Sequence, residues 1–211
     1  MKSGTPQCAK CPVVRCHPVD RDKKLPEFCP TRTYPDISRE SIERHKNDPY
    51  VRGIDLAWVE LMSKVQQDWY SWTRLDEIIE YARIRGVKKI GIATCVGLLT
   101  EAKLLTRVLE GHDFQVVSVC CLAGEVSPGD VDIVREGIFC NPIMQAEVLN
   151  REGTGLNVML GLCLGHDILF TRYSEADVTT LIVKDRALGH NPAVALYLTE
   201  SYYRNRFKKK D

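Results

Sequence analysis

The fold is decided by residues 87–94, which read VKKIGIAT and are followed at once by Cys95. This short apolar run predicts a buried strand, and the helical spacing of apolar residues from Leu98 to Gly111 predicts a helix after it. Further strand-like patterns lie at residues 114–119, 156–162 and 178–183, and they alternate with helical patterns at residues 143–151, 165–173 and 192–203. The alternation predicts an α/β fold, an open parallel sheet of about four to five strands with helices on both faces.

The chain before this sheet divides into two parts. Residues 37–86 show helical patterns and are expected to pack as a helical segment on the core. Thr73 is predicted to cap the last of these helices, which is expected to end at Gly86. Residues 1–36 are rich in proline and cysteine and lack periodic apolar residues, so we expect a bound metal to staple them. The predicted organisation is therefore a cysteine-rich module at 1–36, a helical segment at 37–86 and an α/β domain at 87–207.

The composition argues against several classes of protein. Lys and Arg number 29 and Asp and Glu 28, a net charge of +1, which argues against a nucleic-acid or membrane-surface protein. The N-terminus has no apolar leader and no apolar stretch is long enough to span a membrane, so a cytoplasmic location is expected. In a reducing cytoplasm the nine cysteines would be thiols, and so many thiols point towards metal.

Four cysteines lie near the N-terminus, at Cys8, Cys11, Cys16 and Cys29. A Cys-x2-Cys turn places two sulfur atoms on one side of a loop, and the other two cysteines can complete a four-thiolate site. A [4Fe–4S] cluster is favoured because proline follows two of the four, as it often follows cluster ligands. Zinc, which also takes four thiolates, is the alternative at this site.

The other five cysteines follow predicted strands or precede a predicted helix, at Cys95, Cys120, Cys121, Cys140 and Cys163. Ligands of open parallel sheets bind outside the carboxyl ends of the strands, so these thiols are expected to meet there. Neighbouring residues of a strand point in opposite directions, so one of Cys120 and Cys121 should face the site, and Cys121 is favoured. Cys163 is expected to be a fourth ligand or a free thiol. Ordinary core packing is the alternative for each cysteine taken alone.

Polar residues gather in the same loops. His166 and Asp167 follow Cys163, and His190 lies in the loop after the last predicted strand. These three side chains are candidates for acid and base catalysis or for donors to sulfur. Simple helix capping is the alternative for Asp167 and Asn141.

Four segments resemble a family of cysteine-rich, predicted metal-binding proteins of unknown function from anaerobic bacteria and archaea. They are Cys8-x2-Cys11-x4-Cys16, CNPIMQAEVLN at residues 140–150, GLCLGHD at 161–167 and KDRALGHNP at 184–192. The resemblance implies metal binding and an anaerobic, cytoplasmic setting, but it brings no substrate and no catalytic residue.

Several functions remain open at this point. The favoured one is an iron–sulfur protein with one or two [4Fe–4S] clusters, in which the sheet-edge cluster serves a non-redox enzyme acting on a small molecule, sulfur-containing ones included. The alternatives are an electron-transfer or redox-sensing module with a partner protein, and a zinc-stapled binding protein. Thiol chemistry at Cys120 and Cys121 is a weaker fourth hypothesis.

Overall fold

The computed structural model describes residues 5–13, 16, 23–134 and 136–208. By its contacts the chain separates into two units, Met1–Glu60 and Leu61–Asp211. The two units are described in turn.

Short helices make up the described part of the first unit. They are the 3-10 helix η1 (Cys8–Lys10), α1 (Pro30–Thr33), α2 (Pro35–Asn47) and the first part of α3 (Pro49–Val65). Three of these helices start at a proline, which suits the first turn because its missing N–H would have no partner there. An ion pair of 2.7 Å between His45 and Asp55 ties α2 to α3.

The second unit is built on a parallel sheet of four strands, which confirms the predicted α/β class. The strands are β1 (Lys89–Thr94), β2 (Gln115–Cys120), β3 (Leu156–Leu160) and β4 (Asp177–Ile182). Their order across the sheet is β2-β1-β3-β4, and each neighbouring pair is parallel. The central strands β1 and β3 are almost wholly buried, because both of their faces are covered.

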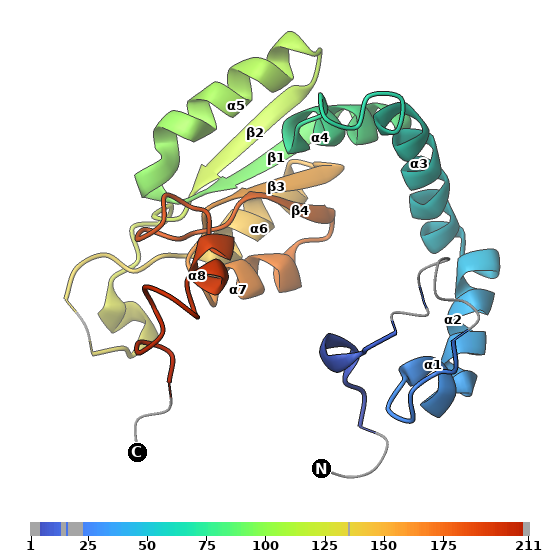
Figure 1. The fold of residues 1–211 in the computed structure, drawn as a ribbon. Helices are drawn as coiled ribbons and strands as arrows, with labels where there is room; N and C mark the ends of the chain where they lie inside the picture. Colours follow the sequence, from blue (N-terminus) through green and yellow to red (C-terminus); the bar gives the residue numbers. More distant parts are fainter. Residues whose placement is uncertain (1–4, 14–15, 17–22, 135, 209–211) are drawn as a thin grey trace. The chain divides into compact units, whose positions relative to one another are not determined.

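Helices cover the two faces of the sheet, giving three layers (Figure 1). The helices are α4 (Arg74–Ile84), α5 (Leu99–Gly111), α6 (Pro142–Arg151) and α7 (His166–Tyr173), with the short α8 (Ala193–Tyr197) near the end. One apolar core joins α4 and α5 to Ile90, Ile92 and Val158. The second core joins α6 and α7 to Ala93, Val119 and Met159 on the opposite face.

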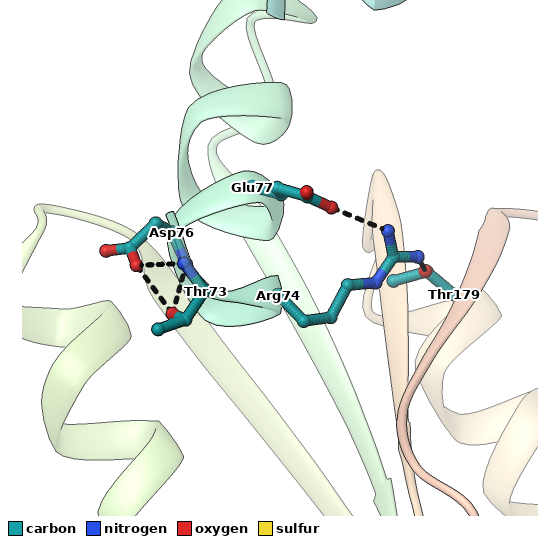
Figure 2. A network of polar contacts seen from close by, with 5 residues as sticks. All are labelled: Thr73, Arg74, Asp76, Glu77 and Thr179. Atoms are coloured by element: carbon teal, nitrogen blue, oxygen red, sulfur yellow. Dashed lines mark hydrogen bonds and ion pairs between the residues drawn. The ribbon is translucent and has the colours of Figure 1, made fainter. Parts of the chain in front are cut away.

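The start of α4 is capped as predicted (Figure 2). The Thr73 N–H donates to the Asp76 carboxylate at 2.8 Å, and the Asp76 N–H donates to the Thr73 hydroxyl at 3.3 Å. Beside this box, Arg74 donates to Glu77 at 3.0 Å and to the hydroxyl of Thr179 at 2.7 Å. Arg74 therefore ties the first turn of α4 to the edge strand β4.

A buried polar network lies where β1 passes β3. Gly91 pairs with Asn157, whose side chain accepts a hydrogen bond from Thr154 at 2.7 Å and donates to Ser174 at 2.8 Å. A Cβ atom at Gly91 would lie 2.0 Å from the Asn157 side-chain oxygen. Glycine is therefore required here by the close approach of a buried amide.

The predicted helix at residues 192–203 is wrong in its second half. The helix α8 ends at Tyr197, and the chain continues as turns in which Thr199 and Ser201 donate to carbonyls three residues back. Leu196 and Tyr197 are 71% and 77% exposed, so this segment lacks the packing that would extend a helix. Among the described residues, no helix has the length and apolar character needed to cross a membrane.

Candidate metal centre

The topology gathers the cysteine-bearing loops at the carboxyl ends of the strands. The chain leaves β1 through α5 on one face and leaves β3 through α7 on the other, so the loops after these neighbouring strands diverge. Ligand sites of open α/β sheets lie at such a switch point. Cys95 follows β1 and Cys163 follows β3, one on each side of it.

Backbone hydrogen bonds position Cys95, Cys121 and Cys140 at the carboxyl ends of the strands. The Cys95 N–H donates to the Leu160 carbonyl at 3.1 Å, and the Cys121 N–H donates to the Thr94 carbonyl at 2.8 Å. Each bond continues the parallel ladder one residue past its strand. The Cys121 carbonyl accepts the Asn141 N–H at 2.8 Å, and this bond brings Cys140, at the start of α6, beside Cys121.

The side chains of Cys95, Cys121 and Cys140 form what we call the thiol cluster. The sulfur atoms of Cys121 and Cys140 are 3.8 Å apart, and the Cys121 side chain lies close enough to Cys95 to help lower the pKa of the Cys95 thiol. The Val96 N–H also donates to the Cys121 sulfur at 3.3 Å. The structure thus brings together three of the four cysteines expected at the sheet edge, and it places Cys121 rather than Cys120 in the group.

The pKa values of Cys95 and Cys121 are shifted in opposite directions. Burial raises the pKa of the Cys95 thiol, but the Gly97 N–H and the Lys184 ammonium group outweigh it, so that its pKa lies below the ordinary value. Burial raises the pKa of Cys121 to about 12 against the opposing Val96 N–H, and the neighbouring thiols add to the rise.

Two basic side chains from the loop after β4 reach the thiols. The Lys184 ammonium group lies close enough to Cys95 to lower the pKa of its thiol, and Arg186 donates to the Cys163 sulfur at 3.3 Å. The Cys163 side chain raises the pKa of Arg186, with smaller contributions from Cys95 and Cys140, so three of the cysteine side chains lie within electrostatic range of one guanidinium group. Sequence reasoning passed over both cations, although their segment follows the last strand directly.

His190 and Asp185 shape the loop that carries these cations. The Asp185 N–H donates to the His190 ring Nδ1 at 3.0 Å, and the His190 N–H donates to the Asp185 carbonyl at 2.7 Å. The Asp185 carboxylate accepts from the N–H groups of Ala187 and Leu188, both at 3.0 Å. The candidate catalytic residue His190 thus holds the two ends of its own loop together through its hydrogen bonds with Asp185.

The other two candidate catalytic residues lie after β3. The Asp167 carboxylate accepts the N–H groups of Gly165 and Ile168 at 2.9 and 2.8 Å, so it closes the first turn of α7. The His166 ring makes an edge contact with Phe139, with centroids 6.2 Å apart, next to Cys140 in the chain. Of the three candidates, His166 is therefore the one that contacts the segment carrying Cys140, through Phe139.

Gln145, on the first turns of α6, fastens the strand ends beneath the thiol cluster. Its amide nitrogen donates to the Thr94 carbonyl at 3.1 Å and to the Val119 carbonyl at 2.7 Å. The side chain is fully buried, and its amide oxygen has no hydrogen-bond partner among the residues that the structure describes. The two carbonyl partners require the nitrogen on their side, which fixes the orientation of the amide. Gln145 was missed from the sequence because it resembles any polar residue of a surface helix.

The N-terminal cysteines lie in the first unit. In the turn of η1 the Cys11 N–H donates to the Cys8 carbonyl at 3.1 Å, and Cys8 and Cys16 are exposed. Cys29 is 6% exposed and precedes α1, whose first turn its carbonyl closes. Their role as ligands stays a prediction.

Across residues 5–13, 16, 23–134 and 136–208, no three acidic, histidine or cysteine side chains are spaced closely enough to hold a metal ion as they stand. The thiol cluster is therefore a group of hydrogen-bonded thiols, which would have to reorient to bind a metal. The donor chemistry nevertheless fits: two thiolates on one tetrahedral metal with bonds of about 2.3 Å lie about 3.8 Å apart. That separation matches the measured distance between Cys121 and Cys140.

Fold and site together define an α/β protein with a thiol cluster at the carboxyl edge of a parallel sheet. The chain belongs to the family described as "Protein of unknown function (DUF1847)", whose model matches residues 29–181. It is 45% identical over 171 residues to "Uncharacterized protein MJ0455" of the archaeon Methanocaldococcus jannaschii, covering 77% of this chain and 84% of the relative. The resemblance to a family of unknown function is thereby confirmed. The matched residues contain the thiol cluster and Cys163, while Cys8, Cys11 and Cys16 lie before them.

Proposed function

We propose that this protein binds a metal centre through cysteine thiolates at the carboxyl edge of its sheet, and that the centre is an iron–sulfur cluster serving a non-redox reaction on a small molecule. The observation that carries the proposal is the 3.8 Å contact between the Cys121 and Cys140 sulfur atoms, with the Cys95 side chain close enough to Cys121 for each to shift the pKa of the other.

The surroundings of the thiol cluster support an anionic centre. Metal–thiolate groups carry net negative charge, and Lys184 and Arg186 supply two positive charges at the sulfur atoms. The Val96 N–H donates to the Cys121 sulfur at 3.3 Å, a kind of contact that tunes metal–thiolate centres. A bound cation would also reverse the high pKa of Cys121, because it favours the thiolate.

The proposed roles follow from these contacts. Cys95, Cys121 and Cys140 would be the ligands, and Cys163, beside Arg186, a fourth ligand or a free thiol. When bound through three cysteines, such a centre supplies a Lewis acid with one open position. His166 is best placed to move a proton, because the side chains of Asp167 and His190 are committed to their own loops.

A zinc ion is the second candidate, and one specific observation favours it. The 3.8 Å separation of Cys121 and Cys140 equals that of two thiolates sharing a single tetrahedral ion. Three thiolates with an open fourth position would then resemble a catalytic zinc site.

The test is purification under strict exclusion of oxygen, followed by counts of iron, acid-labile sulfide and zinc and a visible spectrum. Iron and sulfide in equal amounts with broad visible absorption would support the cluster. Colourless protein with zinc alone would select the second candidate. Spectral changes caused by a redox partner, with every iron fully ligated by cysteine, would favour an electron-transfer role.

Adjacent cysteines provide the matched control. Cys121→Ser should remove the sheet-edge metal, whereas Cys120→Ser should leave it, because Cys120 lines a cavity outside the thiol cluster. The double variant Cys8→Ser and Cys11→Ser measures the metal held by the predicted N-terminal site. Metal content that Cys121→Ser leaves unchanged in this background would reject the proposal.

A further inference from the structure

A cavity lies on the other side of the same sheet edge. It occupies about 670 Å³ between α5 and the carboxyl ends of β1 and β2. The strands contribute Thr94, Ser118 and Cys120 to its lining, and α5 contributes Leu99, Lys103 and Arg107 among others. Sites for small molecules typically have volumes of ~300–1,000 Å³.

The lining combines an apolar surface with positive charge. Leu99, Ala102 and Leu104 supply aliphatic side chains, and every charged residue of the lining is basic. Lys103 and Arg107 are one helical turn apart on α5, and within the described part of the chain neither makes an ion pair. The cavity therefore offers two cations that no described acidic side chain neutralises.

The position of the cavity agrees with its chemistry. Its lining includes Thr94 and Cys120, the last residues of β1 and β2, and open α/β sheets bind their ligands at such strand ends. Thr94 and Cys120 line it, and the residues that follow them, Cys95 and Cys121, belong to the thiol cluster. The ends of β1 and β2 therefore contribute residues both to the cavity and to the thiol cluster.

We propose that this cavity binds a small organic anion, a carboxylate, sulfonate or phosphate ester with an apolar body. The anionic group would lie at Lys103 and Arg107, with the Ser118 hydroxyl as a hydrogen-bond donor, and the apolar body would lie against Leu99 and Ala102. Cys120 would lie beside the bound molecule. The proposal does not depend on a metal, so its failure and the failure of the proposed function are separate results.

The probe for the test is 8-anilinonaphthalene-1-sulfonate, an aromatic sulfonate whose fluorescence rises in apolar surroundings. Titration of the folded, as-purified protein should show one saturable site that weakens as salt is raised. The double variant Lys103→Gln and Arg107→Gln should weaken the affinity about tenfold, since it removes both charge-assisted contacts. The control Arg151→Gln, on the exposed surface of α6, should bind the probe like the wild type.

Two further measurements place the bound molecule. The probe should slow alkylation of Cys120 by iodoacetamide, read by mass spectrometry of the peptide that contains it. Hexanoate should displace the probe at a lower concentration than hexan-1-ol, which has the same chain without the charge. Absence of saturable binding, an affinity unchanged by the double variant, an unprotected Cys120 or equal potency of the two competitors would each overturn the proposal.

Discussion

Gln145 offers the sharpest test of how the strand ends are held under the thiol cluster. Its amide donates two buried hydrogen bonds, at 3.1 Å to Thr94 and 2.7 Å to Val119, while its own oxygen has no partner within the described part of the chain. Gln145→Met keeps the length of the side chain and removes both bonds, a loss of about 2 kcal/mol. Removing the unpartnered oxygen offsets part of this, so the net cost should be about 1–2 kcal/mol.

Gln145→Glu should cost more and should depend on pH. An ionised carboxylate has no proton to donate to the two carbonyl oxygens, and burial without a counter-charge costs about 3–5 kcal/mol. Burial raises the pKa of the introduced carboxyl above its unfolded value of about 4.3. The folded state then holds the proton more tightly, so the free energy of unfolding falls as the pH rises, by up to about 1.4 kcal/mol per pH unit.

The assay is urea denaturation of both variants and the wild type, followed by circular dichroism at pH 5 and pH 8 with metal content measured alongside. The gap between Gln145→Glu and Gln145→Met should widen from pH 5 to pH 8. Equal stability of the two variants at pH 8, or a gap that does not change with pH, would refute the role assigned to the Gln145 amide.

Three other outcomes are expected. Gly91→Ala should destabilise the protein by about 2–4 kcal/mol in urea denaturation, because its Cβ would displace the buried Asn157 amide, whereas Gly111→Ala at the end of α5 meets open space and should be neutral or stabilising. A loss below about 1 kcal/mol for Gly91→Ala would contradict the close approach. Thr73→Ala should lower the melting temperature through the loss of a helix cap worth about 1 kcal/mol, and an unchanged value would count against the capping box. Hydrogen bonds from Thr73 lower the pKa of Asp76, so its contribution is complete above about pH 4 and is lost as the pH falls through the lower folded value. The stability gap between the wild type and Asp76→Asn should therefore shrink on acidification, and a gap that grows would contradict this.

Much of the fold follows from local patterns in the sequence. The run at 87–94 becomes β1 at Lys89–Thr94, because its residues are apolar enough to be covered on both faces. Thr73 caps α4 as predicted, and Gly86 adopts a φ of +67°, since both effects depend on neighbours in the chain alone. The last helix ends early because helix length depends on packing, which the exposed Leu196 and Tyr197 lack.

The site was predictable only in part. The rule that ligands gather at the carboxyl ends of strands predicted that Cys95, Cys121, Cys140 and Cys163 would lie near one another, and the position of Cys121 further into the loop favoured it over Cys120. The contacts of Lys184 and Gln145 depend on the strand order and on how α6 docks, which no local pattern contains. Acid–base roles cannot be read from residue type, since the same carboxylate can face a ligand or close a turn as Asp167 does.

The thiol cluster has a consequence for the order of folding. Cys121 and Cys140 are 19 residues apart in the chain, and the two bonds that position Cys121 and Cys95 join strands that pair only through crossover helices. Pairing of parallel strands across such separations is among the slower steps of chain collapse. We therefore expect the three cysteines to come together late in folding, after β1 has paired with β2 and β3.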